Sequence, residues 1–183
     1  MKIRYVLPDD LWEISDVYEK SWKYAYKNII PQDYLDSIPE GNWADNINMN
    51  DRKNIVMTEN DIIIGTLSFC KSRWKQYSDY GEIVAIYFLP EYIGKGYGKD
   101  LLDRGIEELQ IMGFEYILLW VLEENNRARN FYEKYGFIYN GQHRNDNIGG
   151  KELTELMYEY QIGKAQNYFA NIECLKSGVR NEL

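Results

Sequence analysis

The chain has 183 residues, of which 45% are hydrophobic and 15% aromatic, and its formal net charge is −8 at pH 7. This length and composition predict one globular domain with its own core, and they exclude a disordered chain. The acidic charge argues against nucleic acid or an anionic membrane as a partner, because both bind basic surfaces. It suits a cationic acceptor such as an amine, although an acidic balance also serves solubility alone.

The sequence gives no sign of membrane, disulfide or metal chemistry. No apolar run approaches the ~18 residues of a spanning helix, and the first residues lack the apolar core of a signal peptide. Cys70 and Cys174 are too few for a disulfide framework, and with the single His143 they make no metal cluster. We therefore expect a cytoplasmic protein that binds no metal and no membrane.

The first eighty residues predict a strand, two or three helices and a hairpin. In chain order these are a strand at 2–6, a helix after Pro8-Asp9-Asp10, a short helix opened by Pro31, a turn or two of helix at 42–50, a hairpin of strands 54–58 and 62–71 across Glu59-Asn60-Asp61, and a loop at 72–80 that overhangs a site. In the short helix, Tyr34, Leu35 and Ile38 fall on the side predicted to be buried.

The stretch from Gly81 to Met112 organises the chain. Residues 82–89 are apolar and β-branched after the first, which predicts a strand buried on both faces and ended by Pro90. Three glycines, Gly94, Gly96 and Gly98, then precede an amphipathic helix that ends near Met112. Open backbone followed by a helix N-terminus predicts an anion site, most plausibly for phosphate. The spacing fits neither a P-loop nor a GxGxxG dinucleotide turn, and a flexible helix entry that binds nothing is the alternative.

The remaining pattern predicts alternating strands and helices. It places a helix end at Gly113, an apolar strand at 116–122, a helix capped by Asn125 or Asn126 and ended by Gly136, and a hairpin of strands 138–143 and 152–160 around a turn at 145–150. We expect an α/β (α+β) fold with a mixed, mostly antiparallel sheet and helices on both faces. The parallel exception is the strand pair joined by the 96–112 helix.

Two segments resemble one family. The segment PEYIGKGYGKDLL at 90–102 resembles the acyl-CoA-binding turn of the GNAT superfamily of N-acetyltransferases, [Q/R]-x-x-G-x-[G/A], with Ile93 where Gln or Arg is usual. The segment NNRARNFYEKYGF at 125–137 resembles the family pattern N-x-x-A-x-x-F-Y-x-k-x-G-F. The resemblance implies a GNAT fold with its two central strands splayed apart, a domain at 1–162 and a tail at 163–183. The tail allows a short packing or dimer-contact helix or a frayed terminus, so a homodimer stays open.

The resemblance implies acetyl-CoA as co-substrate and a set of residues that hold it. These are the backbone of Ile86, Tyr87 and Phe88, the turn of Ile93, Gly94, Lys95, Gly96, Tyr97, Gly98 and Lys99, and the helix residues Asn125 and Phe131. For Asn125 an ordinary helix N-cap is an equal alternative.

Acetyl transfer to an amine needs a proton acceptor and a proton donor. Glu82 is the charged residue that heads the apolar strand, and histone-acetylating members resemble the chain here, with their general base at the same offset from the Gln or Arg position. The alternative is a glutamate at the solvent edge of the strand, with Glu123 or Glu124 as proton acceptor through water. The family motif implies that Tyr132 protonates the leaving thiolate. The alternative is that Tyr132 is an ordinary core tyrosine.

The resemblance implies that the region of the chain between the first helix and the second strand forms one wall of the acceptor pocket, with Trp22, Tyr24, Tyr26 and Tyr34 as candidate contacts or, alternatively, core aromatics. We expect direct transfer of acetyl to the primary amine of a small molecule in a ternary complex, because neither cysteine lies in a motif. The acidic charge and a loose likeness to polyamine-acetylating enzymes favour a polyamine-like acceptor. The alternatives are a peptide or protein acceptor, and a non-catalytic acetyl-CoA-binding module.

Overall fold

The structure, a computed structural model, describes residues 1–47 and 51–163. Its elements are β1 (Lys2–Tyr5), α1 (Leu11–Ala25), α2 (Gln32–Ser37), β2 (Lys53–Glu59), β3 (Ile62–Lys71), β4 (Gly81–Phe88), α3 (Tyr97–Ile111), β5 (Tyr116–Leu122), α4 (Asn126–Tyr135), β6 (Ile138–Ile148) and β7 (Lys151–Gln161), with short 3-10 turns at Pro8–Asp10, Ala44–Asn46, Lys75–Tyr77 and Pro90–Tyr92. The predicted tail helix and the end of the predicted 42–50 segment lie outside the described residues.

The strands form one sheet in the order β1-β2-β3-β4-β5-β7-β6. Every neighbouring pair is antiparallel except β4 and β5, which run parallel and are connected through α3. This confirms the predicted mixed, mostly antiparallel sheet and its single parallel pair. A parallel pair needs a crossover connection, and the amphipathic α3 supplies it.

The two central strands separate almost as soon as they meet. The pairing of β4 with β5 covers only Gly81 with Ile117 and Glu82 with Leu118. Beyond these residues β5 continues to pair with β7 as far as Leu122, whereas no described strand lies on that edge of β4. The predicted splay is therefore present, and it opens a gap at the centre of the sheet toward the ends of both strands.

A β-bulge in β4 decides which side chains face which helix. Ser68 of β3 pairs with Ala85 but the next residue, Phe69, pairs with Ile83, which leaves Val84 as the extra residue. As a result Ile83 and Ile86 pack into the same core cluster although they are three residues apart. Tyr87 is turned to the opposite face, where it packs against the α1 cluster.

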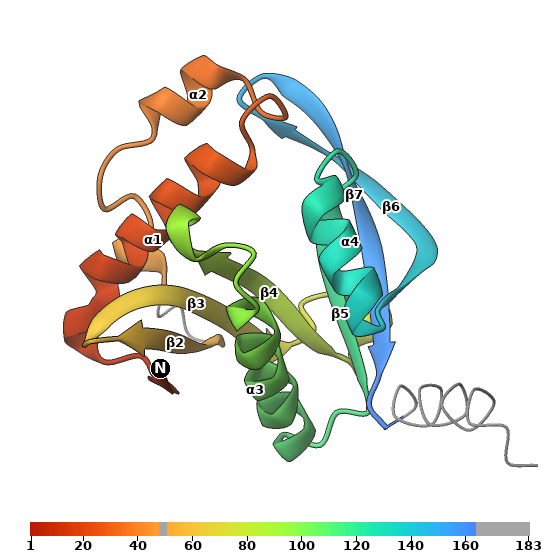
Figure 1. Cartoon of the computed structure of the whole chain (residues 1–183). Coiled ribbons are helices and arrows are strands. Elements are labelled where there is room, and N and C mark those ends of the chain that lie inside the picture. Colours follow the sequence, from red (N-terminus) through yellow and green to blue (C-terminus); the bar gives the residue numbers. More distant parts are fainter. Residues whose placement is uncertain (48–50, 164–183) are drawn as a thin grey trace, which may run out of the picture.

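Helices cover both faces of the sheet, and Figure 1 shows α1 and α2 apart from α3 and α4. One core cluster joins the sheet to α3 and α4 through side chains such as Leu101, Leu102 and Phe137. A second joins it to α1 through Ile14 and Val17. This accounts for the apolar stripe predicted for each helix.

The hairpin of β6 and β7 is longer than predicted. β6 continues to Ile148, and the turn consists of Gly149 and Gly150, both with positive φ. The expectation of an irregular turn at 145–150 was wrong because polar residues such as Asn145, on the edge strand β6, still pair across the ladder with β7. The hairpin tip reaches α2, and the two lie side by side at the top of Figure 1.

The expectation for α2 was right for two residues of three. Leu35 and Ile38 are buried, whereas Tyr34 is 39% exposed, so its predicted burial was wrong. Tyr34 instead lies over Gly149, where an added Cβ would come within 2.6 Å of the tyrosine Cβ. The ring thus covers the hairpin tip instead of entering a core.

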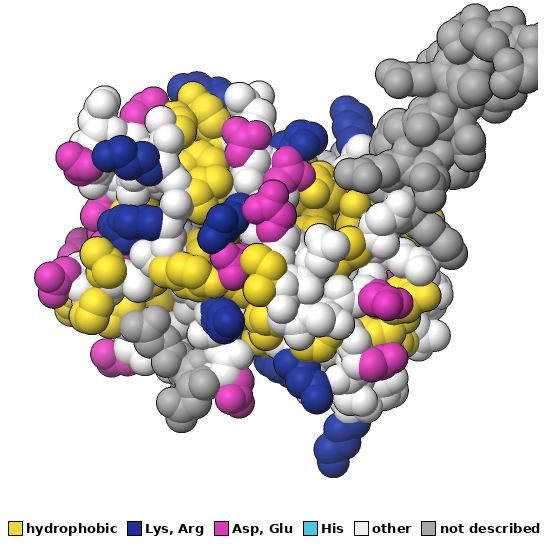
Figure 2. Space-filling model, turned by 90° about the horizontal axis from the view of Figure 1, so that it is seen from below, with side chains coloured by type: hydrophobic (Ala, Val, Ile, Leu, Met, Phe, Trp, Pro, Cys, Tyr) yellow, Lys and Arg dark blue, Asp and Glu magenta, His cyan; other side chains and the backbone are white. Residues whose placement is uncertain are grey.

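The surface carries charges of both signs. On the face drawn in Figure 2, Lys and Arg side chains are interspersed with Asp and Glu, so this face presents no basic stripe of the kind that binds nucleic acid. Within residues 1–47 and 51–163, no helix combines the length and apolar composition needed to cross a bilayer.

Candidate active site

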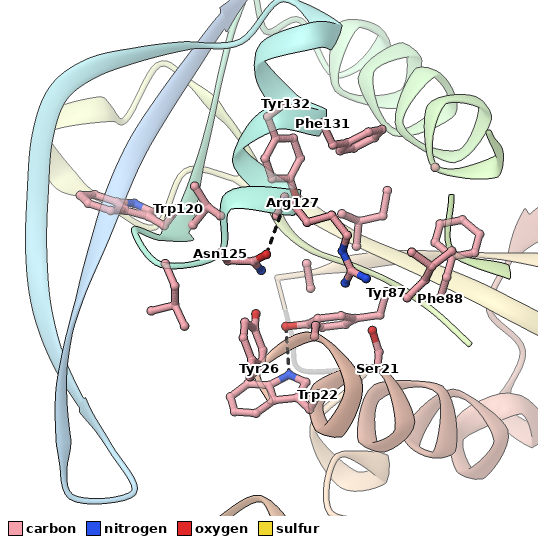
Figure 3. A pocket seen from close by; sticks show the side chains of 18 of the residues that line it. Ser21, Trp22, Tyr26, Tyr87, Phe88, Trp120, Asn125, Arg127, Phe131 and Tyr132 are labelled. Carbon is pink, nitrogen blue, oxygen red and sulfur yellow. Dashed lines mark hydrogen bonds between the residues drawn. The ribbon is translucent and has the colours of Figure 1, made fainter. Parts of the chain in front are cut away.

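A cavity of about 1190 Å³ occupies the gap between the splayed strands. Its walls come from α1, the second half of β4, the end of β5, α4 and the β6–β7 hairpin, and Figure 3 shows side chains from α1 and α4 facing one another across it. The cavity continues to the glycine turn at Gly94–Gly98. It therefore joins the predicted anion site to the face of the sheet that α1 covers.

The glycine turn has the backbone that the sequence predicts. Gly94 and Gly96 have φ of +82° and +94°, values that side-chain-bearing residues rarely adopt, and Gly96 is the N-cap of α3. At Gly98 an added Cβ would lie 3.3 Å from the Phe131 ring of α4. Of the first-turn N–H groups of α3, that of Lys99 donates to the Gly96 carbonyl at 3.0 Å, whereas those of Tyr97 and Gly98 have no intrahelical acceptor, so this end of the cavity suits a phosphate.

Two cationic side chains line the cavity. Lys99 lines the cavity and pairs with Asp103 at 2.7 Å, and Asp103 also accepts a hydrogen bond from the Tyr135 hydroxyl. Arg127 of α4 extends into the cavity in Figure 3, and its guanidinium lies 5.0 Å from the Tyr24 ring. The backbone turn and these two cations together favour a phosphorylated ligand.

Tyr132 lies between the two ends of the cavity. Tyr132 projects from α4 into the cavity and is 8% exposed. Asn125 caps the same helix by accepting a hydrogen bond from the Ala128 N–H at 3.2 Å. Burial raises the pKa of the Tyr132 phenol, and the neighbouring Tyr87 adds to the rise. The phenol therefore keeps its proton at neutral pH and can act as a hydrogen-bond or proton donor.

Aromatic side chains form the opposite wall. Trp22 Nε1 of α1 donates a hydrogen bond to the Tyr87 hydroxyl at 3.0 Å, and the Trp22 and Tyr26 rings meet edge to face. The Tyr26 and Tyr87 hydroxyls lie near each other in Figure 3. Burial raises the pKa of both phenols. This wall therefore offers neutral phenols and π-faces, which suit a cationic or amphipathic acceptor.

Glu82 lies elsewhere. Its side chain is 1% exposed, and its carboxylate accepts hydrogen bonds from the Arg73 backbone N–H at 3.0 Å and from Arg73 Nη2 at 2.6 Å. It does not line the cavity, and it stands where β4 and β5 still pair, before the splay begins. The alternative of a solvent-edge glutamate is wrong, since the side chain is enclosed; its role as proton acceptor stays a prediction.

The cavity brings together most of the predicted site residues. Those that line it are Trp22, Tyr26, Ile86, Tyr87, Phe88, Ile93, Gly94, Gly96, Gly98, Lys99, Asn125, Phe131 and Tyr132. Lys95 and Tyr97 do not line it: the Lys95 ammonium lies 4.9 Å from the Tyr92 ring, and Tyr97 packs near the same ring. Tyr34 and Tyr24 also stay outside, although Tyr24 borders a smaller neighbouring pocket beside Asn125.

Among the cavity-wall residues that sequence reasoning missed are Ser21, Trp120, Arg127 and Glu155. Ser21 lies one residue before Trp22, and Trp120 lies within the predicted strand at 116–122, so helix and strand spacing could have found them. Glu155 gave no local signal, because its place depends on how β7 pairs with β5. Among the described residues, no three His, Cys, Asp or Glu side chains come together as a metal site.

A splayed sheet that leads from a glycine turn to an aromatic pocket defines the class of acyl-CoA-dependent acyltransferases. The model of the acetyltransferase (GNAT) family matches residues 12–137. An uncharacterized N-acetyltransferase, YuaI of Bacillus subtilis strain 168, is 33% identical over 135 residues, which are 73% of this chain and 78% of that protein. The chain therefore belongs to the acetyltransferase (GNAT) family and is an acyl-CoA-dependent N-acetyltransferase.

Two further matches, one in sequence and one in structure, come from Thermoplasma acidophilum. A spermidine N(1)-acetyltransferase is 27% identical over 166 residues, covering 87% of this chain and 98% of that protein. The crystal structure of PaiA N-acetyltransferase in complex with coenzyme A superposes with a TM-score of 0.70 at 21% identity, covering 87% of this chain and 98% of that one. The structural likeness confirms the predicted fold.

Proposed function

We propose that the protein transfers the acetyl group of acetyl-CoA to a primary amine of a small, polyamine-like molecule, by direct attack in a ternary complex. The observation that carries the proposal is the continuous cavity, which joins the glycine turn to an aromatic pocket through the gap between β4 and β5. The relative named for spermidine acetylation supports an amine of this kind.

The residues at the glycine end fit the acetyl-CoA they would hold. Gly94 and Gly96 take positive φ, and an added Cβ at Gly98 would crowd the Phe131 ring at 3.3 Å, so the glycines let the backbone approach a pyrophosphate closely. Along Ile86, Tyr87 and Phe88, the open edge of β4 can pair with an extended chain as a strand would. Ile93, Lys99 and Asn125 border the same channel. We also propose that the acetyltransferase domain ends near residue 162.

When bound, acetyl-CoA would supply a thioester. Residues of this chain would stabilise the negative charges that develop on its carbonyl oxygen and on its sulfur. The amine nitrogen attacks the carbonyl carbon, so that a C–N bond forms and the C–S bond breaks. Backbone N–H groups of β4 stabilise the oxygen anion, and Tyr132 donates its proton or a hydrogen bond to the departing thiolate. The same burial that raises the pKa of Tyr132 also disfavours the thiolate, which helps proton transfer between them.

The experiment is an acceptor panel measured by release of the CoA thiol. Spermidine and 1,4-diaminobutane are compared with butylamine, which has one amine and an apolar tail, and with short peptides. We expect kcat/KM to be at least about tenfold higher for the polyamines. Equal values for butylamine would remove the polyamine-like preference, and higher values for peptides would replace the small-molecule acceptor.

Initial rates test the direct transfer. Varying acetyl-CoA at several spermidine concentrations should give intersecting double-reciprocal lines, as a ternary complex requires. Parallel lines would indicate an acetylated enzyme instead. A homodimer and a cytoplasmic location stay predictions, and sedimentation of the full chain tests the first.

A further inference from the structure

The acceptor end of the cavity holds a carboxylate that no motif marks. Glu155 lies in β7 opposite Leu122, the last residue of β5, and it lines the cavity on the face of the sheet covered by α1. Its register places it at the level where β4 and β5 are already apart. A carboxylate at this level is beside the gap through which the two halves of the cavity communicate.

The surroundings hold Glu155 in place. On the neighbouring β6, Arg144 is opposite Glu155, and its guanidinium contacts Glu155 Oε2. The same guanidinium lies against two indole rings that contact each other, 4.7 Å from Trp74 and 5.2 Å from Trp120, with the ring centroids 5.1 Å apart. The predicted overhanging loop thus contributes Trp74 to this arrangement, and the arginine is fixed by both rings and by the carboxylate.

The ion pair leaves hydrogen-bonding capacity unused. Within the described part of the chain, Glu155 Oε2 and Arg144 Nε are both buried without a partner of hydrogen-bonding geometry. The Glu155 side chain is 17% exposed and lines the cavity. A carboxylate that lines a cavity can accept hydrogen bonds from an ammonium group.

The charges around Glu155 also favour a cation. Arg144 and Asp146 face it from β6, and Arg73 faces it from the loop before β4, where it also pairs with Glu82. Three carboxylates thus stand against two guanidinium groups, which leaves one net negative charge. From α1 and β4, the Tyr26 and Tyr87 phenols face the same carboxylate and stay neutral because their pKa values are raised.

We propose that the Glu155 carboxylate binds the reacting ammonium group and takes one of its protons, so that the free amine can attack the thioester carbonyl. As the C–N bond forms and the C–S bond breaks, Tyr132 protonates the departing thiolate, and the second proton that the nitrogen loses restores the Tyr132 phenol. One proton thus ends on Glu155 and one on the CoA thiol, so atoms and charge balance over the step. Arg144, Trp74 and Trp120 position the carboxylate. This inference rests on the proposed function and assigns to β7 the role that sequence reasoning placed on Glu82.

Burial, opposed by Arg144 and Arg73, raises the pKa of the Glu155 carboxyl above its ordinary value. Only the carboxylate form can accept the proton. Turnover should therefore increase as the pH rises through this raised pKa. The increase on the acidic side of the pH profile, its acidic limb, is then caused by deprotonation of Glu155. At high pH the limit is set by loss of the ammonium form that the carboxylate binds.

The test compares Glu155→Gln with a matched control, Glu152→Gln, an exposed glutamate of the same strand. With spermidine as acceptor, Glu155→Gln should lower kcat/KM by about 10²-fold and flatten the acidic limb, with acetyl-CoA affinity unchanged. Glu152→Gln should leave all three as in the parent. A Glu155→Gln enzyme that keeps the limb and a kcat/KM within a few-fold of the parent would overturn the inference.

A second pair of variants guards against a folding defect, since Glu155→Gln leaves Arg144 without its charge partner. Glu155→Asp keeps the charge and should retain the limb at reduced turnover. The double variant Arg144→Gln with Glu155→Gln removes both charges and should be as slow as Glu155→Gln alone. If the double variant recovers parental turnover, Glu155 serves only to neutralise Arg144, and the inference fails.

Binding separates this inference from the proposed function. Calorimetric titration of spermidine into the protein with CoA present should show about tenfold weaker binding for Glu155→Gln than for the parent. Equal binding by both proteins contradicts the ammonium contact even if no acetyl transfer is seen. Weaker binding without transfer by the parent would contradict the proposed function and leave the cation site supported.

Discussion

Replacing Tyr132 by Phe removes one oxygen atom and tests the proposed proton donor. Among residues 1–47 and 51–163 no hydrogen-bonding neighbour perturbs the pKa of this hydroxyl; burial and Tyr87 account for the rise. Removing it therefore leaves no buried partner unsatisfied, and we expect the free energy of unfolding to change by less than about 0.5 kcal/mol. The ring packing against Phe131 and Phe137 stays in place.

Turnover should respond very differently. A positioned proton donor contributes about 10²- to 10⁴-fold, so kcat should decrease at least about 10²-fold, equivalent to about 3 kcal/mol in the activation barrier. Thiol release from acetyl-CoA with spermidine measures kcat, and calorimetry measures acetyl-CoA affinity, which should stay near the parental value. Tyr139→Phe, at a tyrosine 40% exposed on β6, is the matched control and should behave as the parent. Unchanged turnover in Tyr132→Phe would refute the assignment.

Three further substitutions test the ion pair of Glu82, the glycine turn and the N-cap of α4. Glu82→Gln removes the charge partner of Arg73 and should lower the free energy of unfolding, measured by urea titration, by about 1–3 kcal/mol. The acidic limb of the pH profile of turnover with spermidine should persist, and its loss would return the proton-accepting role to Glu82. Gly98→Val places methyl groups against the Phe131 ring and should raise KM for acetyl-CoA at least about tenfold, and an unchanged KM would contradict a close backbone approach at this turn. Asn125→Ala removes the N-cap of α4 and should lower the free energy of unfolding by about 1 kcal/mol, whereas Asn125→Asp should preserve it; equal stability of both variants would show that the cap is dispensable.

Local sequence patterns predicted most elements because each had a local cause. Pro90 ends β4, Gly96 begins α3, Asn125 caps α4 and Gly136 ends it with a φ of +116°. The β2–β3 hairpin also turns where expected, with Asn60 and Asp61 both at positive φ. Such signals act within a few residues, so they can be read from the chain alone.

The missed features depend on contacts between distant segments. The bulge at Val84 leaves no mark in an apolar strand, yet it determines that Tyr87 faces α1. The place of Glu82 depends on Arg73 from the preceding loop, and the place of Glu155 depends on strand register across β5, β7 and β6. The sequence therefore predicted the cofactor end of the site, which is built from consecutive residues, better than the acceptor end, which is assembled from five separate segments.

The most direct test of the account follows the acetyl group itself. Acetyl-CoA labelled in the acetyl carbon is incubated with spermidine and the full chain, and mass spectrometry follows the label while free CoA is measured in parallel. Direct acetyl transfer predicts labelled N-acetylspermidine in amounts equal to the CoA released. Release of CoA with the label in free acetate, or no release with any polyamine, would contradict it.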